Sequence, residues 1–183
     1  MQITYSAREA DQNASANAIF TDSVIDNAIS MMAADIREEL KKYSGNILYV
    51  CIMDGGVPFF VKATAQLPLG YCAYLKASSY SGQHQGELVI GALSADVMSR
   101  KYDAVIVFDD ICDSGTTLQA VTHQLAVQFK NTPVYNAVLV WRLREDAILV
   151  PDFSAIPTSD PAFFYGCGMD ADGFGRNANF ITK

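Results

Sequence analysis

Apolar residues recur at helical spacing from residue 21 to residue 43, the first periodic segment of the chain. The residues that form its apolar face are Val24, Ile25, Ala28, Ile29, Met32, Ile36 and Leu40. Small polar residues that suit a helix N-terminus precede this face, and two lysines at its other end suit the negative pole of the helix dipole. The pattern predicts a long amphipathic helix that ends before Ser44-Gly45, whereas residues 1–20 show little periodicity.

Short apolar runs alternate with helical patterns along the rest of the chain. The strands predicted from these runs cover residues 47–52, 71–77, 87–91, 103–108 and 134–140. Two further helices are predicted between them, over residues 58–66 and 116–129. Buried strands that alternate with helices are typical of an α/β fold, in which helices flank a twisted, mainly parallel sheet.

Neither an internal repeat nor a linker interrupts this alternation, so we expect a single domain covering residues 1–183. The segment from about Pro151 onward is rich in proline, glycine and aromatic residues and shows no regular pattern. We expect it to form a small hood beside the sheet, alone or together with the N-terminal segment. Residues 78–86 (SSYSGQHQG) are polar and contain glycine, which predicts a mobile connection between two strands.

Composition and charge narrow the classes of function. Half of the 183 residues are hydrophobic and 18% are charged, which is typical of a globular protein. The formal net charge is -7, and no cluster of lysines and arginines supplies the basic face that a nucleic-acid backbone requires. No apolar run approaches the roughly 20 residues needed to span a bilayer, and the N-terminus lacks the pattern of a signal peptide. We therefore expect a cytoplasmic protein that binds neither nucleic acid nor membrane.

The four cysteines are scattered along the chain, without the paired spacing of a zinc or redox site. Cys51, Cys72 and Cys167 stand in apolar or glycine-rich surroundings, where we expect small buried side chains. Cys112 lies in a polar loop, where we expect partial exposure.

The segment from Val105 to Val121 (VIVFDDICDSGTTLQAV) combines a buried strand, two acids, a turn of small residues and a helix start. Ligands of open α/β sheets bind at the carboxyl ends of the strands, where this turn lies. Backbone N–H groups from Ser114 to Thr117 lack helical partners at such a helix start, so together with the helix dipole they favour an anion. Asp109 and Asp110 suit ribose hydroxyls and the water ligands of Mg²⁺. The pattern therefore predicts a site for a 5-phosphorylated ribose.

This segment resembles the phosphoribosyl-diphosphate signature of the type I phosphoribosyltransferase family, in which an apolar strand, two acids and a spacer precede a Ser/Thr-Gly-x-Thr turn. The matching residues are Asp109-Asp110, Ile111-Cys112, Asp113 and Ser114-Gly115-Thr116-Thr117. The resemblance implies the type I phosphoribosyltransferase fold, phosphoribosyl diphosphate as substrate and Mg²⁺ as cofactor. It also implies that Asp109 and Asp110 bind the ribose and the metal, while the turn binds the 5′-phosphate.

Three further segments resemble the hypoxanthine-guanine branch of that family. The first, Met53-Asp54-Gly55-Gly56, resembles the pyrophosphate loop, in which glycines let backbone amides meet the diphosphate. The family often carries Lys before the two glycines, and this chain carries Asp54 there. The second, Ser78-Ser79-Tyr80, resembles the start of the loop that closes over the active site and excludes water.

The third segment is the tail, where residues 163–170 (FFYGCGMD) and Arg176-Asn177 resemble the purine-branch pattern. The resemblance implies that Phe163 stacks on the purine ring and that the backbone of Phe164 reads the edge of the ring. It also implies that Asp170 holds a second Mg²⁺ through waters and that Arg176 contacts the pyrophosphate. Each assignment has a structural alternative, namely a tight turn at Gly55-Gly56, a core aromatic at Phe163 or a surface ion pair at Arg176.

Base selection depends on the end of the strand predicted over residues 134–140. Purine enzymes of the family carry a Lys there that donates to the 6-oxo group, whereas this chain carries Trp141-Arg142-Leu143-Arg144. A strict alignment places Trp141 at the Lys position, and a shift of one residue places Arg142 there. Trp141 can only stack on a base, whereas Arg142 can donate to the 6-oxo group and to N7. We therefore expect a 6-oxopurine, hypoxanthine or guanine.

The resemblance implies a purine-salvage enzyme that moves the 5-phosphoribosyl group to N9 of the base, giving IMP or GMP and pyrophosphate. Asp113 is the expected catalytic residue, because it would take the proton at N7 and raise the nucleophilicity of N9. Two alternatives stay open: a transferase for another base, such as xanthine, adenine or a pyrimidine, and a non-catalytic regulator that senses phosphoribosyl diphosphate. Members of the family commonly form homodimers or homotetramers, and we expect the same of this chain.

Overall fold

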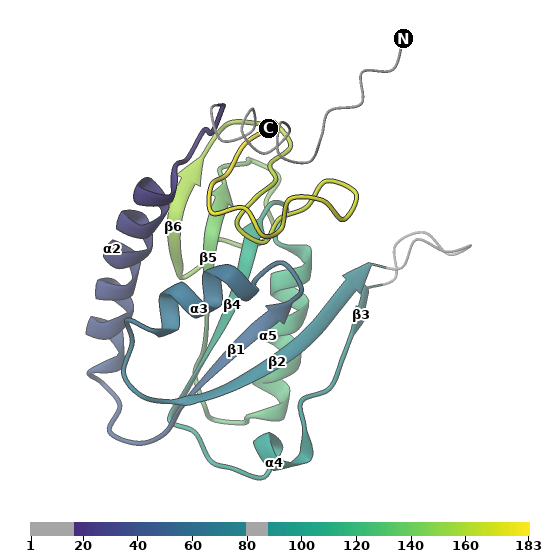
Figure 1. The fold of residues 1–183 in the computed structure, drawn as a ribbon. Helices are drawn as coiled ribbons and strands as arrows, with labels where there is room; N and C mark the ends of the chain where they lie inside the picture. Colours follow the sequence, from purple (N-terminus) through teal and green to yellow (C-terminus); the bar gives the residue numbers. More distant parts are fainter. Residues whose placement is uncertain (1–16, 80–87) are drawn as a thin grey trace.

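The computed structural model describes residues 17–79 and 88–183, and a six-stranded sheet forms the centre of this part of the chain (Figure 1). The strands are β1 (Ile47–Met53), β2 (Tyr71–Ser79), β3 (Leu88–Ile90), β4 (Ala104–Cys112), β5 (Val134–Arg142) and β6 (Phe153–Thr158). Their order across the sheet is β3-β2-β1-β4-β5-β6. Neighbouring strands are parallel except β2 and β3, which are antiparallel, so the expected α/β fold with a mainly parallel sheet is confirmed.

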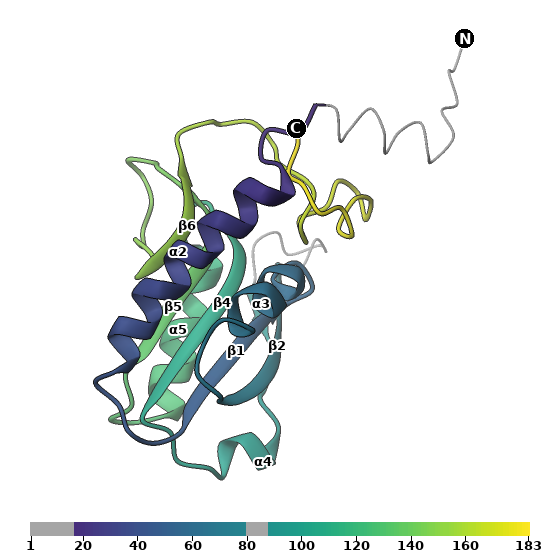
Figure 2. The ribbon, with the colours of Figure 1, turned by 60° about the vertical axis from the view of Figure 1, so that its left-hand side comes forward.

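Helices cover both faces of this sheet. They are α2 (Asp22–Leu40), α3 (Val57–Thr64), α4 (Ala95–Met98) and α5 (Thr116–Gln128). α2 and α3 lie on one face and α5 lies on the other, while the short α4 lies at the end of the molecule below the sheet (Figures 1 and 2). Two apolar cores result, one under each layer of helices.

β4 lies at the centre of both cores. Its residues from Val105 to Phe108 are fully buried, as expected for a parallel strand that is covered on both faces. The Phe108 ring meets three aromatic rings from β1 and α3, with centroid distances of 6.1 Å to Tyr49, 5.8 Å to Phe59 and 5.5 Å to Phe60. This packing fixes the strand immediately before the two acids.

The structure corrects the sequence analysis at two strands. We expected the strand to end at Phe108, but β4 continues to Cys112, because Ile111 and Cys112 pair with Val140 and Trp141 of β5. We expected an irregular tail from Pro151, but residues 153–158 form β6, which runs parallel to β5. β6 is an edge strand, where Pro157 and partly exposed polar residues are tolerated, so its apolar signal is weak.

The residues after β6 form the hood, which lies over the carboxyl ends of the parallel strands (Figure 1). Its backbone is irregular and is held by short bridges, such as the one between Tyr165 and Thr182. The described end of the N-terminal segment joins it, because the N–H of Ile19 donates to the carbonyl oxygen of Ile181 at 2.8 Å. Because β6 occupies residues 153–158, the hood begins after β6 rather than at residue 151.

The solvent exposure of two cysteines differs from expectation. Cys72 is exposed on β2, whereas Cys112 is buried, because β4 includes it and turns its side chain towards the α5 core. None of the described helices combines the length and the apolar composition that crossing a membrane requires.

Candidate active site

The loop after β4 turns sharply before α5 begins. Gly115 precedes the helix with a φ of 87°, in the left-handed region that favours glycine. A Cβ at this position would also lie 2.9 Å from the Cβ of Leu149, so the available space excludes a side chain.

The first N–H groups of α5 have no acceptor within the helix. They border a cavity of about 210 Å³ that is lined by Ile111, Cys112, Asp113, Ser114, Gly115, Thr116, Thr117 and Leu118. The N–H of Thr116 has a long contact of 3.4 Å to Oγ of Ser114. N–H donors without a helical partner and the positive end of the helix dipole make this cavity suitable for an anion.

Of the two acids that precede this loop, Asp109 is buried and Asp110 is partly buried. Asp109 is 7% exposed, and its Oδ1 accepts the N–H of Asp110 at 3.0 Å. Burial raises the pKa of Asp109 well above its usual value, and the neighbouring carboxylate of Asp110 raises it further. Burial also raises the pKa of Asp110. A buried carboxyl group and a partly buried one, side by side, resist ionising together unless a cation compensates them.

The loop after β1 reaches the acid pair because β1 and β4 are neighbours in the sheet. A Cβ on Gly55 would lie 1.9 Å from Oδ2 of Asp110, and a Cβ on Gly56 would lie 2.5 Å from the carbonyl oxygen of Ile52. A Cβ on Gly168 of the hood would lie 1.9 Å from the carbonyl oxygen of Gly55. Glycine at these positions therefore allows three backbone segments to converge at the end of β4.

Asp54, which stands where the resemblance leads one to expect Lys, has a cationic neighbour. The peptide bond between Met53 and Asp54 is cis, and the Asp54 carboxylate lies 3.9 Å from the ammonium group of Lys76. Lys76 belongs to β2 and is aligned with Met53 in the parallel register. Lys76 could not be found from the sequence, because only the register between β1 and β2 places it beside the loop.

A second cavity, of about 280 Å³, lies between the end of β4 and the hood. Its lining residues are Asp110, Ile111, Asp113, Arg142, Phe163, Phe164, Met169 and Asp170. Phe163 is 66% exposed, so it is not a core aromatic, whereas Phe164 is buried. The structure thus brings together six predicted site residues from three distant parts of the chain.

Arg142 and Trp141, the two candidates for base selection, lie on opposite sides of β5. Trp141 packs against the core on the α5 side, whereas Arg142 lines the cavity below the hood. The Arg142 guanidinium lies 5.0 Å from the centre of the Phe164 ring and donates to the carbonyl oxygens of Asp160 and Ala162. These contacts hold Arg142 at the cavity wall.

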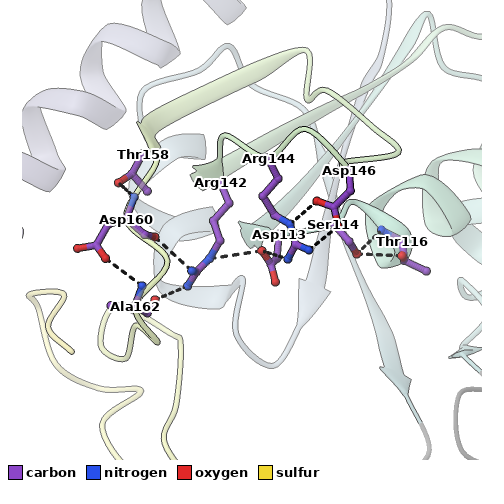
Figure 3. Close-up of polar contacts among 9 residues, drawn as sticks. All are labelled: Asp113, Ser114, Thr116, Arg142, Arg144, Asp146, Thr158, Asp160 and Ala162. Atoms are coloured by element: carbon purple, nitrogen blue, oxygen red, sulfur yellow. Dashed lines mark hydrogen bonds and ion pairs between the residues drawn. The ribbon is translucent and has the colours of Figure 1, made fainter.

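Asp113 lies at the junction of the two cavities and is half exposed. Its Oδ1 lies 3.0 Å from Nη1 of Arg144 and 3.5 Å from Nε of Arg142 (Figure 3). Arg144 in turn forms a forked contact with Asp146. Arg144 was not selected from the sequence, because nothing in its neighbourhood along the chain indicates a contact with the loop after β4.

The hood residues predicted to face the diphosphate and the metal contact each other. Arg176 Nη2 lies 2.6 Å from Oδ1 of Asp170, and Arg176 Nη1 donates to the carbonyl oxygen of Gly168 at 2.8 Å. Asp170 lines the cavity, and the charge of Arg176 is close enough to lower the pKa of Asp110 slightly against the effect of burial. Arg176 therefore lies beside the cavity, in an ion pair of the kind that the sequence analysis named as its alternative.

The acids predicted to hold Mg²⁺ do not form a closed cage. Within the described part of the chain, no group of three or more potential ligand side chains surrounds a common point. Asp110 and Asp170 line one cavity, whereas Asp109, the residue before Asp110, is buried. This set fits Mg²⁺, which retains several waters and is bound through one or two carboxylates together with substrate phosphates.

The predicted closing loop is described only at its start. Ser79 is the last residue of β2 and is aligned with Leu88 of β3. Tyr80 lies outside the described residues.

Sequence and structure comparisons identify similar proteins. The profile of the phosphoribosyl transferase domain family matches residues 16–147. A comparison with the sequences of curated proteins gave no match.

Three solved structures illustrate the similarity of fold. A hypoxanthine phosphoribosyltransferase from Staphylococcus aureus is 20% identical, with a TM-score of 0.82 over 97% of this chain and 96% of that one. A hypoxanthine-guanine phosphoribosyltransferase from Bacillus anthracis is 20% identical, with a TM-score of 0.76 over 90% and 95%. A variant of the hypoxanthine phosphoribosyltransferase from Trypanosoma cruzi, in a ternary substrates complex, is 19% identical, with a TM-score of 0.79 over 93% and 95%. At these identities the similarity shows the fold alone.

The raised pKa of the buried Asp109 predicts a pH-dependent gain in stability for Asp109→Asn. The folded state raises the pKa of Asp109, so the wild type loses stability as pH rises from the unfolded pKa near 4 through the folded value. The variant lacks this loss, so its melting temperature should exceed that of the wild type by an amount that grows from pH 5 to pH 8. Thermal unfolding in a buffer with a metal chelator measures this difference. Asp35→Asn, an exposed change on α2, is the control. A wild type more stable than Asp109→Asn throughout this range would contradict the prediction.

Proposed function

The chain belongs to the phosphoribosyl transferase domain family, and we propose that it transfers the 5-phosphoribosyl group from phosphoribosyl diphosphate to N9 of hypoxanthine or guanine. One observation carries the proposal: the anion cavity at the start of α5 adjoins the aromatic cavity under the hood. Ile111 and Asp113 line both cavities. A sugar phosphate in the first cavity and a planar base in the second would therefore meet beside Asp113.

The anion cavity suits the 5′-phosphate. The N–H groups at the start of α5 supply donors without basic side chains. The hydroxyls of Ser114 and Thr116 are hydrogen-bonded to each other at 2.9 Å, which leaves one hydroxyl proton to donate to a ligand. Donors of this kind would let a protein with a net charge of -7 bind a phosphate. The Asp110 carboxylate lines the neighbouring cavity under the hood and lies against Gly55, and it would accept from the ribose hydroxyls.

The aromatic cavity suits a 6-oxopurine. The exposed ring of Phe163 offers a face for stacking, and the forked donors of Arg142 suit a 6-oxo group or N7. Adenine would present an amino group to these donors, and a buried donor left without an acceptor weakens binding. The products would be IMP or GMP, which is the chemistry of purine salvage.

Asp113 is the group that would manage the proton of the base. Its Oδ1 contacts two arginines, so Oδ2 is the oxygen left for N7 of a bound purine. Removing that proton raises the electron density at N9, which attacks C1′ of the ribose. General base catalysis of this kind contributes about 10²–10⁴ in rate.

The diphosphate would lie beside the Gly55 loop, between Lys76 and Arg176. Asp110 and Asp170 would hold Mg²⁺ through waters, and the bound metal would neutralise the departing diphosphate. Lys76 would offset the charge of Asp54 and contact the diphosphate from the β2 side.

Pyrophosphate release tests the proposed function. The purified protein is given phosphoribosyl diphosphate and Mg²⁺ with hypoxanthine, guanine, xanthine or adenine in separate reactions. We expect release with hypoxanthine or guanine and at least about 100-fold lower kcat/KM with adenine, since unpaired buried donors discriminate strongly between bases. No release with any base would refute the transferase proposal, and release with adenine alone would refute the 6-oxopurine assignment.

Lys76→Met should raise the KM for phosphoribosyl diphosphate by about tenfold and leave the KM for the base unchanged. The variant leaves the charge of Asp54 uncompensated beside the diphosphate, and a hydrogen bond to a charged group contributes about 1.5–3 kcal/mol, with the lower end expected at an exposed site. Initial-rate kinetics measure both constants.

Two further variants make this test specific. Asp54→Asn in the Lys76→Met background should recover part of the lost affinity, because it removes the repelling carboxylate. Lys130→Met, an exposed change just beyond α5, should have no effect. An unchanged KM in Lys76→Met would show that Lys76 does not serve the diphosphate.

A further inference from the structure

The segment between β5 and β6 lies against the loop that follows β4. The N–H of Ile148 donates to the carbonyl oxygen of Ser114 at 2.9 Å, and Leu149 fills the space next to Gly115. Arg144, from the same segment, donates to Oδ1 of Asp113 (Figure 3). Backbone contacts thus fix the loop, whereas Arg144 contacts the loop only through the side chain of Asp113.

The arginines contact only one of the two carboxylate oxygens of Asp113. Oδ1 accepts from Nη1 of Arg144 at 3.0 Å and lies 3.5 Å from Nε of Arg142. Among the described residues, no hydrogen bond engages Oδ2 of Asp113. The side chain of Asp113 is 50% exposed, so without these contacts it would be free to change its rotamer. The two arginines therefore restrict which carboxylate oxygen can face a ligand.

Arg144 is itself held in place. Its Nε donates to Oδ1 of Asp146 at 2.8 Å and its Nη2 donates to Oδ2 of Asp146 at 2.7 Å. This forked geometry is the one in which an arginine binds a carboxylate most specifically. Asp146 and Asp113 both raise the pKa of Arg144, so the guanidinium stays charged across the working range of pH. Three charged side chains thus form a chain that ends at the Asp113 carboxylate.

We propose that Arg144, anchored by Asp146, is a positioning residue that fixes the Asp113 carboxylate with Oδ2 towards N7 of the bound base. The inference rests on the proposed function, because it assigns Arg144 to the proton transfer at the base. Ion pairs between exposed side chains contribute little to folding stability, so the effect of Arg144 is on the rate. Misplacing a catalytic group by about 1 Å can reduce turnover by about 100-fold.

A double-mutant cycle between Arg144 and Asp113 tests the proposal. Arg144→Met should lower kcat with hypoxanthine or guanine by about tenfold to a hundredfold, while the KM for phosphoribosyl diphosphate changes less than about twofold. Asp113→Asn should lower kcat by about 10² or more. In the Asp113→Asn background, adding Arg144→Met should change kcat by less than about twofold, because the group that Arg144 positions is already absent.

Two single variants complete the cycle. Asp146→Asn should also lower kcat, but by a smaller factor than Arg144→Met does, because it weakens the contact that anchors Arg144 and leaves Arg144 itself in place. Arg100→Met removes an arginine that contacts Asp96 on α4, away from the cavities, and should leave kcat unchanged. Melting temperatures of all variants show whether the fold is intact.

The outcomes separate the inference from the function on which it rests. The positioning role would be overturned if Arg144→Met had the kcat of the wild type. It would also be overturned if Arg144→Met lowered kcat by the same factor in the Asp113→Asn background as in the wild type. A raised KM for phosphoribosyl diphosphate would also overturn it, because Arg144 would then support the phosphate loop. No pyrophosphate release by the wild type with any base would refute the proposed function, and the inference would fall with it.

Discussion

β4 pairs in parallel with β1 on one side and with β5 on the other, and the positions of the functional groups depend on this pairing. Parallel strands end at the same edge of a sheet, so the Gly55 loop, the Asp109–Asp110 pair and Arg142 all emerge at one edge. The apolar run from Val105 to Phe108 secures the arrangement, because it is buried on both faces by helices and aromatic rings. The hood then covers this edge and adds the aromatic wall.

Acidic side chains, backbone N–H groups and arginines set the electrostatics at this edge of the sheet. Two acids lie side by side at the end of β4, and burial raises the pKa of both in the free protein. In the proposed complex, a ribose and a divalent cation would compensate them. The proposed anion binding would depend on backbone N–H groups and a helix dipole, so few cations would be needed. The arginines close to the cavities are engaged with carboxylates or carbonyl oxygens, which holds them in place before a ligand arrives.

Much of the fold could be predicted from the sequence, because its apolar runs and helical patterns are long and clear. The predicted helix over residues 58–66 and the predicted strand over residues 134–140 correspond to α3 and β5, with small shifts at their ends. β6 was missed because an edge strand with a proline needs no continuous apolar run, and its partner strand decides that it forms. β4 extends through the acids for the same reason, since pairing with β5 outweighs the local preference of aspartate for a turn.

The candidate site was predictable where a local pattern carries the chemistry, as in the loop from Asp109 to Thr117. Residues that act across strands could not be found in this way. Lys76 is brought to Asp54 by the register of β1 with β2, and Arg144 is brought to Asp113 by a connection that folds back over the loop. The choice between Trp141 and Arg142 likewise depended on which face of β5 each side chain occupies.

The central claim is that the end of β4 and the start of α5 together bind a 5-phosphorylated ribose. A crystal structure of the protein soaked with phosphoribosyl diphosphate and Mg²⁺ tests it most directly. We predict the 5′-phosphate on the N–H groups from Ser114 to Thr117, with the ribose beside Asp110 and the diphosphate between Lys76 and Arg176. A ligand bound elsewhere on the protein, with the cavity at the start of α5 left unoccupied, would contradict the account.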